Sequence, residues 1–241
     1  MVDPRTSIID ERLKGVRNII AVSSGKGGVG KSVIASTLAL ILARKDYKVG
    51  LFDLDFTSPS THVILGVGSI CPEENEGIIP PEVHGLRYMS IVYYSHEHAL
   101  PLRGADISNV LVELLAVTKW NTLDFLIIDM PPGISDATLD ILRYVKRASF
   151  LLVTTSSPLA FESVRKLIEV LSELKIPIIG VIENMKMKES QFIQQRTKEK
   201  GIRFWGDLPF DDQLEETMGD VNRVLETKFG KKLRELVEKN L

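Results

Sequence analysis

The chain has a single cysteine, Cys71, in 241 residues. One cysteine excludes a disulfide framework within the chain and is typical of a protein in a reducing compartment. Long apolar runs are also missing: none approaches the roughly 20 residues that span a bilayer, and the first residues lack the apolar core of a signal peptide. We therefore expect a cytoplasmic protein with no stable membrane association.

The chain also lacks a large excess of either positive or negative charge. The chain has 30 Lys and Arg residues against 32 Asp and Glu residues, which leaves a formal net charge of -2. Because such a chain offers no broad positive field, we expect no nucleic-acid partner. Hydrophobic residues make up 44% and charged residues 26%, as in ordinary globular proteins, and no segment in the middle reads as a linker. The prediction is one domain over residues 1–241.

Strand-like and helix-like runs alternate along the chain, a pattern typical of a parallel sheet with crossover helices. The predicted strands are Asn18–Ser23, Val49–Asp53, Leu86–Ile91, Phe125–Asp129, Phe150–Thr154, Ile178–Ile182 and Phe204–Trp205. The predicted helices are Lys31–Arg44, Ser108–Val117, Ser135–Tyr144, Phe161–Leu174, Glu189–Lys200 and Lys228–Asn240. Residues 68–81, rich in Gly, Pro and Glu, are predicted to form a surface loop. The fold class is α/β, with a mostly parallel central sheet flanked by two layers of helices.

Residues 25–32 carry the most informative motif. They read Gly-Lys-Gly-Gly-Val-Gly-Lys-Ser, which matches the phosphate-binding loop G-x-x-x-x-G-K-S between a predicted strand and a predicted helix. The glycines let successive backbone N–H groups cradle phosphate oxygens, and the helix N-terminus adds partial positive charge. The fold is therefore predicted to be a three-layer P-loop NTPase fold. The loop residues predicted to bind the nucleotide are Gly25, Lys26, Gly27, Gly28, Val29, Gly30, Lys31 and Ser32.

Three side chains of this loop have predicted roles. Lys31 is expected to reach the β- and γ-phosphates, and the Ser32 hydroxyl is expected to ligate Mg²⁺. Lys26 is a second lysine inside the loop, where an ordinary phosphate-binding loop needs only one.

Carboxylates follow two of the predicted strands. Asp53 and Asp55 lie at the end of one strand, where Asp55 is placed to orient an attacking water and Asp53 to hold Mg²⁺ or anchor the loop. The alternative is that both acids only form a turn. Asp129 ends the apolar run Phe125–Ile128, the form of a Walker B strand whose acid supports Mg²⁺, and Pro131–Gly133 then forms a loop that can sense the γ-phosphate.

The predicted base is adenine. Asn184 follows the apolar run at 180–182, and its amide offers both a donor and an acceptor to a base. No Asn-Lys-x-Asp guanine motif occurs in the chain. The alternative is that Asn184 is an ordinary turn residue. His96 and His98 resemble a metal-ligand pair, but without a nearby cysteine or third histidine in sequence they are more simply exposed loop residues.

Together these segments resemble the MinD/Mrp family of P-loop ATPases with a deviant Walker A loop, from about Arg17 to Pro209. Lys26 corresponds to the family's signature lysine. The stretch that follows Asp55 resembles the Mrp pattern D-x-x-G-P-S-x-P-x-x-L-G, with departures at Ser58 and His62. The other matching segments are Arg103–Gly104, Asp129–Asp136 and Glu183–Met185.

The resemblance implies ATP or ADP and Mg²⁺ as cofactors, with Asn184 contacting adenine and Pro209 also at the nucleotide. It also implies a homodimer in which Lys26 contacts the nucleotide of the partner subunit.

One departure bears on the cargo. Mrp-type iron–sulfur carriers place C-x-x-C shortly after the E-N-M segment, but residues 186–192 contain no cysteine. The segments 62–66, 101–104 and 159–171 resemble the atypical ATPase of archaeal [NiFe]-hydrogenase maturation. That resemblance implies a role in nickel insertion, with the nickel metallochaperone HypA and the hydrogenase large subunit as partners.

Two alternatives remain open. One is an Mrp-type iron–sulfur cluster carrier. The other is a MinD-like membrane-cycling regulator, which needs a basic amphipathic C-terminal helix. The tail at 228–241 is amphipathic, but Glu235 and Glu238 offset part of its positive charge, so we expect its apolar stripe to pack on the sheet.

Overall fold

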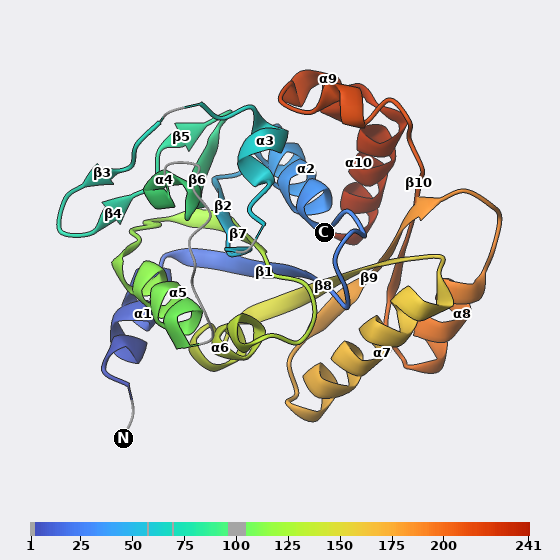
Figure 1. Ribbon diagram of the computed structural model, residues 1–241, viewed down its shortest axis with the longest axis horizontal. Coiled ribbons are helices and arrows are strands. Elements are labelled where there is room, and N and C mark those ends of the chain that lie inside the picture. Colours follow the sequence, from blue (N-terminus) through green and yellow to red (C-terminus); the bar gives the residue numbers. More distant parts are fainter. Residues whose placement is uncertain (1–2, 57, 69, 96–104) are drawn as a thin grey trace.

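The computed structural model of the protein describes residues 3–56, 58–68, 70–95 and 105–241. Within these ranges one eight-stranded sheet runs through the molecule in the order β10-β9-β8-β1-β7-β2-β6-β5 (Figure 1). Its strands are β1 (Val16–Ser24), β2 (Val49–Asp53), β5 (Glu82–Val83), β6 (Leu86–Ser90), β7 (Leu123–Asp129), β8 (Ala148–Thr155), β9 (Ile178–Lys186) and β10 (Phe204–Pro209). All neighbours pair in parallel except β5, which runs antiparallel to β6.

Helices cover both faces of this sheet (Figure 1). One layer holds α2 (Lys31–Ala43), α3 (Thr61–Leu65), α9 (Val221–Glu226) and α10 (Lys228–Asn240). The other holds α1 (Arg5–Leu13), α5 (Ala105–Val117), α6 (Asp136–Tyr144), α7 (Pro158–Glu173) and α8 (Phe192–Glu199). The short α4 (Val92–Ser95) follows β6, and the turn η1 (Glu215–Thr217) precedes α9. The predicted three-layer fold is confirmed.

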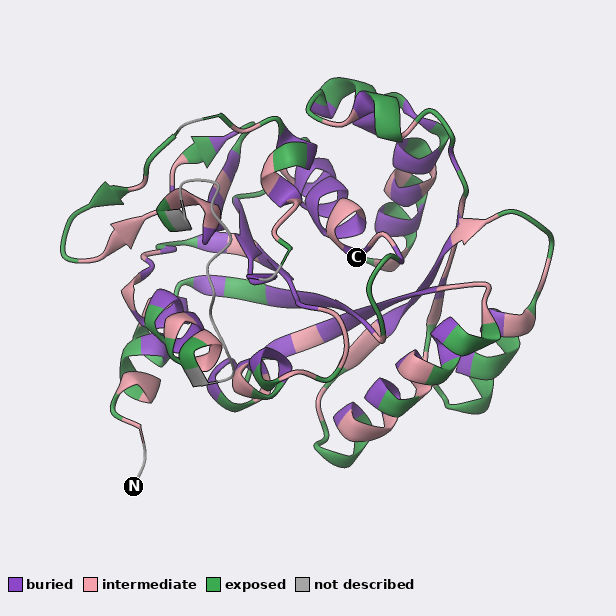
Figure 2. Ribbon diagram, viewed as in Figure 1, coloured by how far each residue is buried: buried purple, intermediate pink, exposed green. Residues whose placement is uncertain are grey.

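The central strands are largely apolar because both of their faces are covered. Figure 2 shows most of the sheet buried, and every residue of β2 is buried. Two hydrophobic clusters result, one on each side of the sheet. The first contains Phe52 and Ile128, and the second contains Leu51 and Ile127, so successive residues of each strand point into opposite clusters.

The predicted elements differ from the structure mainly at their ends. β9 continues to Lys186, which places Glu183 and Asn184 inside the strand rather than after it, and β10 continues to Pro209. The C-terminal helix packs against α2 and β10 and buries Phe229 and Leu233, as expected. Within the described ranges, no helix is both long enough and apolar enough to cross a membrane.

The prediction of a plain loop over residues 68–81 is wrong in part. This stretch contains a small antiparallel hairpin, β3 (Glu73–Glu74) and β4 (Ile78–Ile79). The backbone N–H of Lys119, just beyond α5, donates to the Ile78 carbonyl at 2.7 Å. A contact from a segment so distant in sequence cannot be seen in local composition.

Candidate functional site

The loop at residues 25–32 lies between β1 and α2 and is held closely by its neighbours. Gly28 and Gly30 have φ angles of 77° and 80°, in the left-handed region that favours glycine. A Cβ on Gly30 would lie 2.3 Å from the Asn184 amide nitrogen, and one on Gly25 would lie 2.4 Å from the Ser163 backbone. The loop therefore has one backbone path, fixed by α7 on one side and β9 on the other.

A buried ion pair joins this loop to the sheet. The Lys31 Nζ lies 2.6 Å from Asp129 Oδ1, with exposed side-chain fractions of 6% and 0%. Lys31 also donates to the Ser32 hydroxyl at 3.1 Å. Burial raises the pKa of Asp129, and the positive charge of Lys31 opposes that rise.

The second carboxylate oxygen of Asp129 is the feature that fits a cation. Asp129 Oδ2 is buried and has no hydrogen-bond partner among the described residues. A buried carboxylate oxygen with no donor is costly, and Mg²⁺ prefers hard oxygen ligands. Ser32 Oγ and Asp129 Oδ2 are therefore the atoms that fit Mg²⁺ best in this part of the site.

Asp53 uses both of its carboxylate oxygens for protein contacts. Oδ2 accepts from the Thr61 hydroxyl at 2.5 Å, and Oδ1 accepts from the Asp55 backbone N–H at 3.1 Å. The Thr61 hydroxyl also lies 2.8 Å from the Tyr88 hydroxyl. Burial, and then the charge of Asp129, raise the pKa of Asp53 to about 7. Of its two predicted roles, these contacts favour anchoring the loop after β2.

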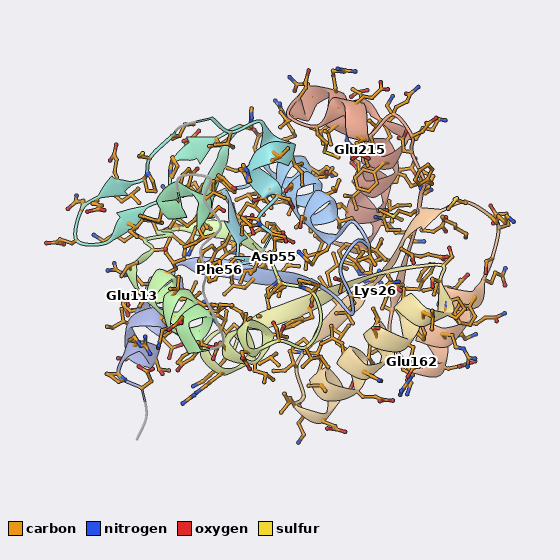
Figure 3. All side chains as sticks on the ribbon, viewed as in Figure 1. Lys26, Asp55, Phe56, Glu113, Glu162 and Glu215 are labelled. Carbon is orange, nitrogen blue, oxygen red and sulfur yellow. The ribbon has the colours of Figure 1, made fainter. Side chains whose placement is uncertain are left out.

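Asp55 and Lys26 lie at the same edge of the sheet, in the centre of Figure 3. Asp55 is 7% exposed, and its Oδ1 accepts from the Ser58 backbone N–H at 3.2 Å. The Lys26 side chain is exposed, while its backbone carbonyl accepts from the Ser24 hydroxyl at 2.9 Å. The structure thus holds the backbone of Lys26 and leaves its ammonium group in solvent.

The loop after Asp129 is bonded to the end of β1, directly before the phosphate-binding loop. The Gly133 N–H donates to the Ser24 carbonyl at 2.8 Å, and the Gly133 carbonyl accepts from the Thr138 hydroxyl at 3.1 Å. Ser135 caps α6 by accepting from the Thr138 N–H. Two hydrogen bonds therefore join Ser24, the residue before the phosphate-binding loop, to the start of α6.

A cavity of about 220 Å³ opens beside Gly30, next to Asn184 and Pro209. The Asn184 amide nitrogen donates to the Val29 carbonyl at 2.8 Å, whereas its oxygen is buried without a partner in the described chain. The Asn184 carbonyl oxygen is therefore an acceptor left for a ligand. At C6 adenine carries an amino group and guanine carries a carbonyl, so this acceptor suits the C6 amino group of adenine.

The structure brings together nearly all the side chains predicted for the site. Residues 25–32, Asp53, Asp55 and Asp129 share one edge of the sheet, and Asn184 and Pro209 line the adjoining cavity. Sequence reasoning missed Thr61, which fixes Asp53, and the apolar walls of the cavity, Met185, Phe210, Leu214 and Met218. Thr61 stands at a variable position of the pattern after Asp55, Met185 ends the matching segment Glu183–Met185, and the other three lie outside any motif.

His96 and His98, expected to be exposed loop residues, and the matching segment Arg103–Gly104 lie outside the described residues. Within the described part of the chain, no group of three or more His, Cys, Asp or Glu side chains is arranged to hold a metal ion. Cys71 is exposed and unpaired.

A glycine-rich loop between a buried strand and a helix, with a lysine paired to the acid that ends the neighbouring strand, defines a P-loop NTPase. The ParA family model, described as NUBPL iron-transfer P-loop NTPase, matches residues 15–240. The chain belongs to this family.

Two curated relatives are iron–sulfur cluster carrier proteins. The one from Aquifex aeolicus is 36% identical over 222 residues, which cover 86% of this chain and 61% of the relative. The one from Pseudomonas fragi is 41% identical over 177 residues, which cover 72% and 62%. The chain thus spans less than two thirds of the length of these relatives. They support the iron–sulfur alternative over the predicted nickel branch.

Solved structures agree with the fold. A nucleotide-binding protein from Archaeoglobus fulgidus in complex with ADP is similar, with a TM-score of 0.77, 30% identity and coverage of 92% of this chain and 93% of that one. The cell division ATPase MinD from Pyrococcus furiosus gives a TM-score of 0.69 at 21% identity, with coverage of 92% and 97%. The second likeness concerns the fold alone.

The raised pKa of Asp53 predicts a pH dependence of stability. The folded state holds the Asp53 proton to a pH of about 7, whereas the unfolded chain releases it near 3.8. Between these values the folded state binds more protons, so the free energy of unfolding falls as pH rises. Asp53→Asn cannot ionise, and its stability is expected to fall less across the same window.

Urea unfolding at several pH values in EDTA, without nucleotide, measures this difference. Asp10→Asn, an exposed aspartate on α1, is the matched control and should follow the unmodified protein. Equal pH slopes for Asp53→Asn and the unmodified protein would contradict the assignment.

Proposed function

We propose that the chain is a Mg²⁺-dependent ATPase that works as a nucleotide switch, dimerises around ATP and acts in the assembly of metal cofactors. The observation that carries this proposal is the continuous edge formed by the phosphate-binding loop, the Lys31–Asp129 pair and the Asn184 cavity. The named activities of the relatives support the metal-cofactor setting.

Each part of the edge has a separate task. The backbone N–H groups of residues 25–32 bind phosphate oxygens, and Lys31 supplies a positive charge at the terminal phosphates. Ser32 and Asp129 would hold Mg²⁺, which neutralises charge on the transferred phosphoryl group when bound. The Asn184 oxygen and the cavity at Pro209 hold the adenine base.

Asp55 orients the attacking water. Asp55 lies just beyond the end of β2. Its backbone N–H donates to the buried Asp53 carboxylate, and this bond fixes the backbone from which the Asp55 side chain extends. Phosphoryl transfer needs an in-line nucleophile more than it needs covalent help from the protein. Asp55 accepts a hydrogen bond from the water and holds it facing the γ-phosphate.

Lys26 acts in trans. Its ammonium group is exposed and has no ion-pair partner among the described residues, so it is available to a second subunit. A cation supplied across an interface stabilises the charge that develops on the transferred group, as an arginine finger does. Two identical surfaces that meet in this way form an isologous, two-fold dimer.

The more specific part of the proposal is which metal cofactor the chain helps to assemble. The relatives are named for iron–sulfur clusters, which favours a role in iron–sulfur assembly. Cluster binding between two subunits requires thiolates from both, and this chain has only Cys71, far from the segment at 186–192. We therefore place the metal on a partner protein and the energy-coupling step on this chain.

Because the chain lacks the thiolates of a cluster carrier, a second candidate function remains. This is nickel insertion into [NiFe]-hydrogenase, with HypA as the metal carrier and the large subunit as client. Anaerobic incubation with iron and sulfide distinguishes the iron–sulfur candidate from the nickel candidate. The bound iron and the visible absorption of the protein are measured. A cluster that is retained by the dimer and lost in Cys71→Ser would make the chain itself a carrier. Absence of a cluster, together with ATP-dependent binding of nickel-loaded HypA, would favour the second candidate.

We expect ATP to bind at least tenfold more tightly than GTP, because the free Asn184 oxygen accepts a hydrogen bond from adenine and repels the guanine carbonyl. Isothermal titration with both Mg²⁺-nucleotides measures the ratio. Asn184→Asp retains an acceptor for the base but loses the hydrogen bond to the Val29 carbonyl. It therefore distinguishes the contact with the base from the support of the phosphate-binding loop. Comparable affinities for ATP and GTP would refute the base assignment.

Lys31→Ala and Asp55→Asn should fail in different ways. Lys31→Ala removes the charge at the terminal phosphates and leaves Asp129 buried without its partner, so we expect nucleotide binding to be lost. Asp55→Asn leaves the cradle intact and should retain ATP while turnover falls about 10²–10⁴-fold. Fluorescent-nucleotide binding and phosphate release measure the two effects. Normal hydrolysis by Asp55→Asn would show that its assigned role is wrong.

Asp55→Asn protein should dimerise when ATP is added, and the further change Lys26→Ala should weaken the dimer. In otherwise unmodified protein, Lys26→Ala should lower turnover by up to about 10³–10⁵-fold, the range for a cation supplied in trans. Analytical ultracentrifugation and phosphate release test both statements. Lys239→Ala, an exposed lysine on α10, is the matched control. If Lys26→Ala behaves like Lys239→Ala in both assays, the trans role is excluded.

A further inference from the structure

A second and larger cavity, of about 780 Å³, lies between the β3–β4 hairpin, α4 and α5, away from the edge of the sheet that carries the proposed nucleotide site. We call it the α5 groove. None of the residues assigned to the nucleotide site lines it. Its size is in the range of a recognition site and exceeds the space left by loose packing.

The walls of the α5 groove are fixed by hydrogen bonds. The Ile78 carbonyl accepts from the backbone N–H of Lys119 at 2.7 Å, and the Asn75 N–H donates to the Gly77 carbonyl at 2.9 Å. The Lys119 ammonium donates to the Asn75 carbonyl, and the Arg12 guanidinium donates to the Glu76 carbonyl at 3.1 Å. The hairpin is thereby tied to the C-terminal end of α5, so the groove exists before any partner arrives.

The floor of the groove is apolar. Val110, Leu114 and Val117 lie on one face of α5 at helical spacing, and Ile78 faces them from the hairpin. Tyr94 stands at the margin with 39% of its surface exposed. An apolar strip of this kind is suited to the side chains of an amphipathic helix.

The rim of the groove is acidic. Glu74, Glu76 and Glu113 line it, and among the described lining residues there is no Lys, Arg or His, although Arg12 and Lys119 lie next to Gly77 at the base of the hairpin. Glu76 has a distant partner in Lys119, at 3.9 Å, whereas Glu74 and Glu113 have no ion pair within the described chain. Burial, and then the negative charge of Glu74, raise the pKa of Tyr94, which lines the same cavity.

We propose that the α5 groove binds a basic amphipathic helix of a partner protein, whose apolar stripe covers the α5 floor and whose Lys or Arg side chains meet the acidic rim. The charge of the rim selects the occupant, because an acidic or neutral helix would leave three carboxylates facing apolar or like-charged surface. A second copy of this chain is less suited, since its own basic amphipathic helix, α10, is already packed on α2 and β10.

The groove is connected to the nucleotide edge through the core. Phe56 directly follows Asp55, is 7% exposed and belongs to the same hydrophobic cluster as Ile91 and Leu114, which line the groove. Figure 3 labels Phe56 beside Asp55 and Glu113 on α5. The hydrophobic cluster under the groove therefore extends to the loop after β2. The groove itself does not depend on the ATPase proposal.

Fluorescence anisotropy with two synthetic helical peptides tests the proposal. The first peptide places Leu at helical spacing on one face and Lys on the other, and the second replaces every Lys with Glu. We expect the Leu–Lys peptide to bind the full chain and the Leu–Glu peptide to bind at least tenfold more weakly. The double change Glu74→Lys and Glu113→Lys should weaken the Leu–Lys peptide at least tenfold, and added salt should weaken it further.

Matched controls separate the groove from general charge effects. Glu173→Lys, an exposed residue at the end of α7, should leave the affinity for the Leu–Lys peptide unchanged. Turnover of ATP should be unchanged in the double variant, which makes failure of the groove distinguishable from failure of the ATPase proposal. Absence of Leu–Lys binding, equal binding of both peptides, or equal losses in the double variant and in Glu173→Lys would overturn the proposal.

Discussion

The buried contact between Lys31 and Asp129 is the interaction on which the rest of the site depends. It joins the first residue of α2 to the last residue of β7 across 2.6 Å in a region with almost no solvent. Removing either partner leaves an uncompensated buried charge, which costs about 3–5 kcal/mol. The pair therefore fixes where the helix begins relative to the sheet, and with it the direction of the backbone N–H groups in residues 25–32.

Sheet register extends this constraint to both loops that follow the acidic strand ends. Asp53 and Asp129 are direct neighbours in the β2–β7 pairing, and the Leu54 N–H donates to the Asp129 carbonyl at 2.9 Å. Gly133 returns to β1 through Ser24. A phosphate group bound at Lys31 thus lies at the common origin of two loops, one leading to Asp55 and Phe56 and the other to α6. A switch needs such a shared origin, because the ligand must bias both loops at once.

Much of this arrangement is predictable from the sequence, because the strands are apolar on both faces and the loop motif has a fixed local geometry. The sheet, the two helical layers and the convergence of Lys31, Asp129 and Asn184 follow from these patterns. The hydrogen bond from Thr61 to Asp53 does not follow from the sequence, because side chains eight positions apart in a strand and a following helix give no periodic pattern. The hairpin at residues 73–79 does not follow either, because the segment that holds it in place, at the end of α5, is about 40 residues away in sequence. The sequence indicates nickel because residues 186–192 lack cysteine and three short segments resemble the nickel branch, whereas the relatives named for iron–sulfur clusters match along most of the chain.

Hydrogen–deuterium exchange of the Asp55→Asn protein tests the central claim most directly, that the terminal phosphate controls both loops from the Lys31–Asp129 position. The protein would be compared with Mg²⁺–ADP and with Mg²⁺–ATP at saturation. The account predicts that both nucleotides protect residues 25–32 and that only ATP changes exchange in the segments after Asp53 and after Asp129. The same exchange with ADP and ATP in both segments would contradict it.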